Sequence, residues 1–234
     1  MWKPLSAFAG DATDQKGVMH RVIEERRDLF LLLSLLLIIL MHPVLDHGVL
    51  RRLLLGLLTF VPLILAAMKM AQRKSLVWPY VPLISSAVIF GAVGTILGSH
   101  SLVTLQWAIT TATFALSVVG LFSYLRKAHS VTGGHLYTAA SIYLLLGMLW
   151  FALYSAIEGI HPGSFLQTTA GLTNRPSDLL YFSLATLTTL GYGDIVPVSG
   201  GVRMLATLEA AAGVLYVAIT VALLVSAYKR PEQL

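Results

Sequence analysis

The sequence contains no cysteine and very little charge. Because cysteine is absent from the 234 residues, disulfide bonds and thiolate metal sites are excluded. Only 12% of the residues are charged and 56% are hydrophobic, whereas ordinary soluble domains are about 25% charged. We therefore exclude a soluble globular protein and expect a membrane protein. The net charge of +5 does not indicate nucleic-acid binding, because basic residues collect in the cytoplasmic loops of membrane proteins.

Catalytic and ligand-binding groups are also scarce. The sequence has no Ser-His-Asp grouping and no cluster of metal ligands, so we expect neither an enzyme nor a bound cofactor. It also offers no segment that would form a soluble ligand domain. His42 and His47 are expected to be ordinary polar residues of the first external loop.

Six apolar runs dominate the chain. About 20 residues are needed to cross the hydrocarbon of a bilayer, and the runs cover residues 29–45, 53–68, 76–97, 102–125, 136–157 and 204–228. The sequence therefore predicts an all-α membrane protein with six transmembrane helices. The first two runs are short, and Arg51, Arg52 and Lys69 beside the second are expected to extend to the membrane interface.

The distribution of basic residues predicts the orientation. With six spans, twelve Lys and Arg lie on the side of the two termini and four on the opposite side. The excess places both termini in the cytoplasm, so the plasma membrane is the expected location. Residues 1–28 are then a cytoplasmic N-terminal segment, in which residues 15–28 are either an interfacial amphipathic helix or a solvated tail.

A short apolar stretch and a glycine-containing loop lie between the last two runs. Residues 177–188 follow Pro176, which suits the first position of a helix, but they are too few to span a membrane. Such a re-entrant helix and an irregular loop are tolerated at membrane depth only inside protein or beside water. In the loop, successive carbonyls could replace the water shell of an ion, and Gly191 and Gly193 can adopt the left-handed dihedrals that this needs.

The loop Thr188-Thr-Leu-Gly-Tyr-Gly-Asp194, with the short helix before it, resembles the selectivity filter of the tetrameric potassium channels. The resemblance implies that the filter consists of Thr189, Leu190, Gly191, Tyr192 and Gly193. It also implies that the first four of these residues bind K⁺ through oxygen atoms. Leu190 stands where valine is commoner. The resemblance also implies that Asp194 binds Tyr181, the aromatic residue at the matching position of the pore helix.

Two regions follow from this resemblance. Residues 131–230 resemble a complete pore domain with an outer helix, pore helix, filter and inner helix. Residues 29–130 occupy the place of a voltage-sensing domain. A voltage sensor needs several arginines in its fourth helix, but residues 102–125 contain no charge, so conventional voltage gating is not expected.

The last apolar run contains three features of interest. Glu209 is a carboxylate inside a membrane helix, which is expensive and usually functional; it either hydrogen-bonds behind the filter and braces it or reaches water at the outer interface. Gly213 matches a hinge glycine of inner helices, although close helix packing would also explain it. A stripe of valines is predicted to face a central cavity and to close it by dewetting: Val214, Val217, Val221 and Val225.

The sequence thus predicts a potassium-selective channel that conducts K⁺ passively. One chain supplies one filter loop, so four chains must meet on a symmetry axis in the lipid bilayer. The alternatives are a non-conducting sensor or structural subunit that keeps the pore shape, and a subunit of a potassium uptake system.

Overall fold

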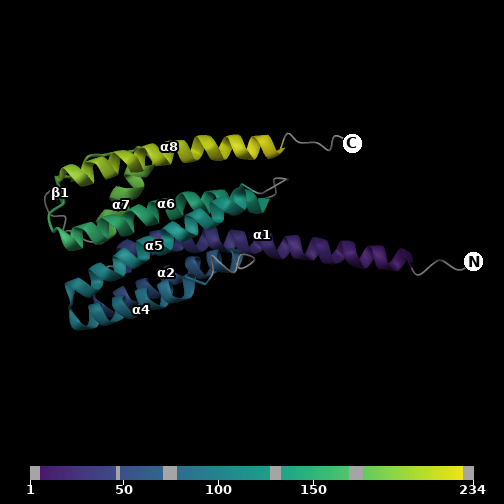
Figure 1. The fold of residues 1–234 in the computed structure, drawn as a ribbon, viewed down its shortest axis with the longest axis horizontal. Coiled ribbons are helices and arrows are strands. Elements are labelled where there is room, and N and C mark those ends of the chain that lie inside the picture. The colour runs from purple at the N-terminus through teal and green to yellow at the C-terminus, as the bar shows by residue number, and fades with distance from the viewer. Residues whose placement is uncertain (1–5, 46–47, 71–77, 127–132, 169–175, 229–234) are drawn as a thin grey trace, which may run out of the picture.

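The computed structural model describes residues 6–45, 48–70, 78–126, 133–168 and 176–228. Within these ranges the chain is almost entirely helical (Figure 1). The helices are α1 (Ser6–Leu45), α2 (Val49–Met70), α4 (Tyr80–Leu97), α5 (His100–Leu125), α6 (Gly133–Ile160), α7 (Pro176–Leu187) and α8 (Gly200–Tyr228). Two strands of three residues, β1 (Phe165–Gln167) and β2 (Ile195–Pro197), form an antiparallel pair.

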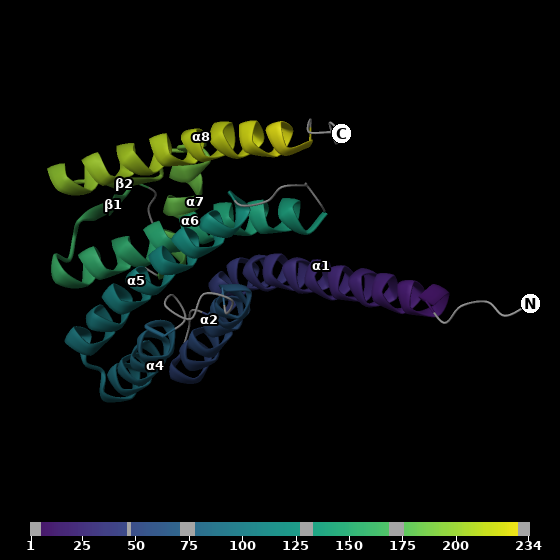
Figure 2. The same cartoon turned by 45° about the vertical axis from the view of Figure 1, so that its right-hand side comes forward.

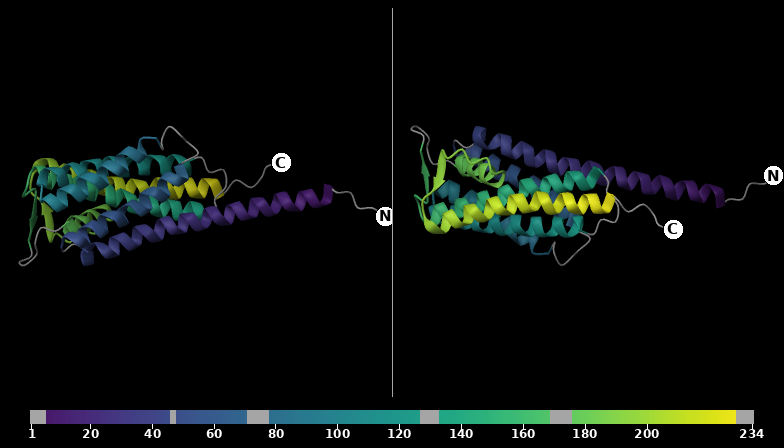
Figure 3. Two further views of the ribbon diagram at one scale, coloured as in Figure 1. Left: turned by 90° about the horizontal axis from the view of Figure 1, so that it is seen from below. Right: turned by 90° about the horizontal axis from the view of Figure 1, so that it is seen from above.

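Helix α6 is the centre of the arrangement. It packs against α1 and α5 on one side and against α7 and α8 on the other, and α7 lies between α6 and α8 (Figure 2). One apolar core joins α6 to α1, α2, α4 and α5, and fully buried members are Leu35, Leu63, Phe114 and Leu145. The β1–β2 pair lies at one end of the molecule, whereas α1 begins and α8 ends at the other end (Figure 3).

Five helices have the length and apolar character of membrane spans. These segments are Glu24–Leu45, Tyr80–Leu97, His100–Leu125, Gly133–Ile160 and Gly200–Ser226. The prediction of an all-α membrane protein is confirmed, but the count of six spans is not, because the apolar part of α2 is shorter, Leu53–Lys69. In the third apolar run the described helix α4 begins at Tyr80, after Trp78 and Pro79, and the predicted start at residue 76 lies outside the described residues.

Helix α1 is longer than its apolar run. It begins at Ser6 and continues without a break to Leu45, so residues 15–28 are helical rather than a solvated tail. His42 is therefore part of α1, where it is buried with 2% of its surface exposed, and not a loop residue. His47 and the predicted domain boundary between residues 130 and 131 lie outside the described residues.

Lys69 does not extend to the interface as expected. It is buried, and its Nζ lies 2.5 Å from Asp28 Oδ1 of α1 and donates to Thr138 Oγ1 of α6. The same ammonium group lies 4.2 Å from the centroid of the Tyr124 ring, a distance that permits a cation–π interaction. The side chains of Arg51 and Arg52 lie outside the described part of the chain. The Lys69–Asp28 ion pair thus joins α2 to α1, and the hydrogen bond to Thr138 joins α2 to α6. The sequence had predicted an exposed lysine here.

Candidate functional site

The short helix α7 is held at both its start and its end. Pro176 is its first residue, where a missing N–H group costs little, and Asp178 in the first turn suits the positive end of the helix dipole. Gln167 of β1 donates from Nε2 to Asp178 Oδ2 at 2.8 Å. The observed bounds, Pro176–Leu187, differ by one residue at each end from the predicted 177–188.

Two glycines allow neighbouring helices to approach α7 closely. A Cβ at Gly213 of α8 would clash with the backbone of Leu187, and a Cβ at Gly147 of α6 would lie 2.7 Å from Leu184 Cδ2. The Leu187 carbonyl also accepts a hydrogen bond from the Tyr143 hydroxyl at 3.3 Å. Helix α8 is continuous through Gly213, so close packing accounts for this glycine in the structure, whereas a hinge there remains a prediction.

The loop after α7 has an alternating backbone conformation. Thr189, Gly191 and Gly193 have φ angles of 60°, 53° and 78°, so every second residue is left-handed. Glycine accepts this conformation readily, whereas for threonine it is unusual. Alternation of this kind can turn successive carbonyl groups toward one side. A loop that binds an ion through its carbonyl oxygens needs this arrangement.

The amide groups at the start of this loop are tied back to α7. The N–H of Thr189 donates to the Thr186 carbonyl at 2.9 Å, and those of Leu190 and Gly191 share the Ala185 carbonyl at 2.8 and 3.2 Å. Within the described residues, no hydrogen bond uses the carbonyl oxygens of residues 189–192. The first three amides of the loop are therefore bonded to α7, and a row of carbonyl acceptors is left available.

The outer end of the loop is fastened to β1 and α7. Thr168, which follows β1, donates its N–H to the Asp194 carbonyl at 2.9 Å, and its hydroxyl lies 3.1 Å from the Gly193 carbonyl. The Tyr181 side chain of α7 lies close enough to the Asp194 carboxylate for the two groups to interact. The structure thus brings together the two residues that the family resemblance paired.

Glu209 lies behind α7 and is completely buried. Its Oε2 accepts a hydrogen bond from the Tyr154 hydroxyl of α6 at 2.7 Å, and its Oε1 accepts one from the Ser183 hydroxyl of α7 at 2.6 Å. Ser183 also lies 2.8 Å from the Gly147 carbonyl. Glu209 therefore links the three helices α6, α7 and α8, as in the first of its two predicted roles, and does not reach water within this chain.

These contacts predict that the hydrogen bonds of Glu209 contribute more to the stability of the protein than its negative charge does. In Glu209→Gln the amide oxygen can accept from Tyr154, and the amide nitrogen can donate to Ser183, which then donates to Gly147. We expect this variant to keep the free energy of unfolding within about 1 kcal/mol of the parent. Glu209→Leu leaves the Tyr154 hydroxyl buried without an acceptor and should lose about 1–3 kcal/mol. Thermal unfolding in detergent measures both.

A second substitution provides the control for this comparison. Adding Tyr154→Phe to Glu209→Leu removes the stranded hydroxyl, and the double variant should recover most of the lost stability. Equal losses for Glu209→Gln and Glu209→Leu would contradict the prediction and would assign the effect to the charge.

The predicted valine stripe is exposed in the single chain. The exposed fractions are 57% for Val214, 49% for Val217, 54% for Val221 and 47% for Val225. The predicted filter residues Leu190 and Tyr192 are also exposed, at 54% and 70%. Apolar surface of this extent on one side of a chain marks either lipid or a protein neighbour.

Several residues of this site were not predicted from the sequence. Tyr154 and Ser183 hold Glu209, and Thr168 holds the outer end of the loop. Polar residues within apolar helices were a signal for the first two, since buried polar groups seek partners. In the described part of the chain no group of three or more His, Cys, Asp and Glu residues could hold a metal ion.

Comparison with known proteins finds relatives of the region from α6 to α8. Residues 138–230 match a family described as ion channel. The inward rectifier potassium channel Kirbac3.1 of Paramagnetospirillum magnetotacticum is 33% identical over 101 residues, which cover 43% of this chain and 29% of that protein. Two pore potassium channel a of Oryza sativa subsp. japonica is 36% identical over 101 residues, which cover 43% of this chain and 25% of that protein.

The similarity is limited to part of each protein. Two pore potassium channel b of the same rice is 40% identical over 72 residues, or 31% of this chain and 18% of the relative. The chain therefore matches less than a third of the length of each of these relatives. No solved structure shows a significant match to the chain.

Proposed function

We propose that residues 138–230, which match a family described as ion channel and are similar to potassium channels, form the pore region of a protein that conducts potassium ions selectively and passively through a pore built by four copies of the chain. The observation that carries this proposal is the loop of residues 189–193. Its alternate residues are left-handed, its first amides are bonded back to α7, and its carbonyl row is unused within the described residues.

These features suit a dehydrated potassium ion. Carbonyl oxygens of Thr189, Leu190, Gly191 and Tyr192 replace the hydration shell, and several neighbouring sites let ions repel one another and move on. The C-terminal end of α7 carries a partial negative charge, and it meets the inner end of the loop at Thr188 and Thr189. A cation is therefore favoured where it would leave its water.

The need for four chains follows from the single loop. One row of carbonyls faces an ion from one side only, and a closed ring requires copies related by a rotation axis. The exposed side chains of Leu190 and Tyr192 and the exposed valine stripe of α8 give such copies a surface to share. Val221 and Val225 then meet near the axis and close the pore by dewetting.

Orientation and gating complete the proposal. Helix α1 begins and helix α8 ends on the side of the molecule opposite the β1–β2 pair, and the excess of basic residues supports a cytoplasmic location for that side. The loop then opens to the outside of the plasma membrane. Because α5 carries no charge between His100 and Leu125, we propose that membrane voltage does not gate the pore through this helix.

Flux across liposomes tests the proposal. The purified protein in vesicles should pass K⁺ at least tenfold faster than Na⁺, and Ba²⁺ should block the flux, while empty vesicles remain tight. A closed gate would hide conduction, so a second measurement is needed. Because bound ions stabilise the native assembly, thermal stability of the tetramer in detergent should be higher in K⁺ than in Na⁺.

Two results would contradict the proposal. Flux without preference for K⁺ would exclude a selective filter. No flux, together with equal stability in K⁺ and Na⁺, would favour a non-conducting subunit that keeps the pore shape. A subunit of an uptake system would need a second protein before any flux appeared.

A further inference from the structure

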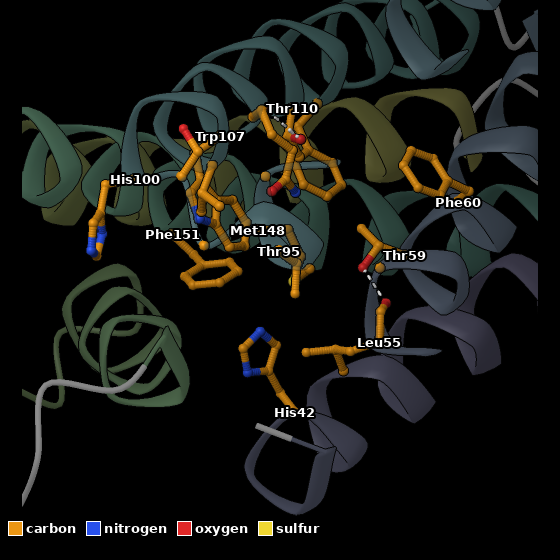
Figure 4. Close-up of a pocket in the computed structure, with 17 residues that line it drawn as sticks. His42, Leu55, Thr59, Phe60, Thr95, His100, Trp107, Thr110, Met148 and Phe151 are labelled. Atoms are coloured by element: carbon orange, nitrogen blue, oxygen red, sulfur yellow. Dashed lines mark hydrogen bonds between the residues drawn. The ribbon is translucent and has the colours of Figure 1, made fainter. Parts of the chain in front are cut away.

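A cavity of about 250 Å³ lies inside the region formed by α1, α2, α4, α5 and α6. Figure 4 shows the side chains of His42, Leu55, Trp107, Met148 and Phe151 around this space. A cavity of about 150 Å³ is enough to hold benzene. This space therefore has room for a ligand of one or two rings, and nothing in the proposed ion pathway uses it.

We propose that this cavity is a binding site for a small, uncharged aromatic molecule that carries one hydrogen-bond donor. The aromatic character of the ligand is inferred from the aromatic side chains in the wall of the cavity. The buried ring of Phe151 lies edge-to-face against both His42 and Trp107, with centroid distances of 5.0 Å in each case. Aromatic rings favour such edge contacts, so a further ring is well matched to this wall.

The absence of charge follows from the lining. Among the described residues that line the cavity, none is Asp, Glu, Lys or Arg, and its two histidines, His42 and His100, offer no charge in their neutral form. A charged ligand would lose its hydration without gaining a counter-charge, which is expensive in an apolar space. An uncharged molecule has no such penalty.

The hydrogen-bond donor follows from two threonines. Thr59 Oγ1 donates to the Leu55 carbonyl at 2.9 Å, and Thr110 Oγ1 donates to the Gln106 carbonyl at 2.8 Å. Each hydroxyl has one hydrogen, which its own helix uses, so both can offer the cavity only lone pairs. A ligand with an N–H or O–H group complements these two hydroxyls, whereas a ligand with only acceptors leaves their lone pairs unused and can bond only with donors elsewhere in the lining, such as the Gln106 amide or the Trp107 indole.

The cavity is not a consequence of loose packing between α4 and α5. A Cβ at Gly94 of α4 would lie 2.9 Å from Leu102 and 3.0 Å from Val103 of α5, and one at Gly91 would lie 3.0 Å from the Gln106 side chain. These helices are already as close as glycine allows. Closing the space would need a different path for α1, α2 or α6.

The cavity also borders the pore domain. Met148 and Phe151 belong to α6, where the Gly147 carbonyl lies 2.8 Å from the Ser183 hydroxyl and Tyr154 donates to Glu209. A ligand against Phe151 therefore lies within one helical turn of the bonds that hold α7. We expect occupancy to change the rate of potassium flux, a consequence that rests on the proposed function.

Binding of indole to the full chain in lipid nanodiscs tests the site itself. Indole is uncharged, has two fused rings and one N–H donor, and benzofuran has the same shape without the donor. Saturation-transfer NMR should give saturable binding of indole, roughly two- to tenfold tighter than that of benzofuran. The double variant Thr59→Val, Thr110→Val should remove this preference.

A cavity-filling variant distinguishes binding of indole in the cavity from its partition into the lipid. Gly56 of α2 lines the cavity, and a Cβ added there would meet nothing within 4 Å, so the side chain of Gly56→Leu starts in open space and is expected to fill part of the cavity. It should abolish saturable indole binding. Leu57→Phe, at the exposed neighbouring position, should bind as the parent does.

The outcomes decide each part of the proposal separately. Non-saturable binding in the parent, or equal binding in Gly56→Leu, would overturn the site. Equal affinity for indole and benzofuran would overturn the donor requirement. Indole that binds but leaves an active flux unchanged would overturn the link to α6 only. Because the binding measurement needs no ion flux, its failure is distinguishable from failure of the proposed channel function.

Discussion

Replacing Gly191 with alanine is expected to abolish potassium-selective flux. Gly191 has φ of 53°, a conformation that costs an L-residue about 1–2 kcal/mol. In a ring of four chains the cost is about 4–8 kcal/mol per assembly by the same rule. A Cβ at this position meets nothing within 4 Å in the chain, so the effect comes from the backbone. We expect the loop to relax, and its carbonyls to turn from the ions.

The control for this prediction is a glycine of similar conformation outside the loop. Gly163, in the turn after α6, has φ of 85° and also open space around a Cβ. Gly163→Ala also places an L-residue in a left-handed conformation, with a similar loss of conformational free energy, but it should keep the preference for K⁺ over Na⁺. Liposome flux and the K⁺-dependence of thermal stability measure both variants. Selective flux retained in Gly191→Ala would contradict the assignment of the filter.

Removing the charge of Lys69 should destabilise the protein strongly. Lys69 and Asp28 have side chains that are only 4% exposed and lie 2.5 Å apart. Lys69→Met leaves the Asp28 carboxylate buried without its cation, and breaking a buried pair in this way costs about 3–5 kcal/mol. The loss should appear as a lower temperature of thermal unfolding in detergent.

The partner substitution distinguishes the ion pair from lysine packing. Replacing both residues, as Asp28→Asn with Lys69→Met, removes both buried charges and should recover most of the stability. Arg26→Met is the matched control, because Arg26 is exposed on the same helix, and it should change the free energy of unfolding by less than about 0.5 kcal/mol. A double variant as unstable as the single one would contradict this account.

Sequence reasoning succeeded where a local pattern decides the structure. Long apolar runs predicted the helices, and Pro176 together with the short apolar stretch predicted α7 to within one residue at each end. Gly191 and Gly193 were expected to be left-handed from the demand on the carbonyls, and both are. Thr189 was not expected to be, because threonine disfavours this conformation.

Sequence reasoning failed where distant residues meet. Lys69 was expected at the interface because the pattern around it gave no sign of Asp28, which lies 41 positions away. The partners of Glu209 likewise come from two other helices. The cavity lies between five helices, so no stretch of sequence describes it. Such features depend on how helices cross, which apolar periodicity does not specify.

The β1–β2 pair has a consequence for how the loop forms. Its strands precede α7 and follow the loop, with Phe165 opposite Pro197 and Gln167 opposite Ile195. The segment that contains α7 and the loop is therefore closed at its base by the hydrogen bonds between β1 and β2. The entropic cost of bringing the two ends of this segment together is met within a single chain. In the proposed assembly of four chains, each copy would bring a loop that is already shaped, so that less conformational entropy would be lost when the copies associate.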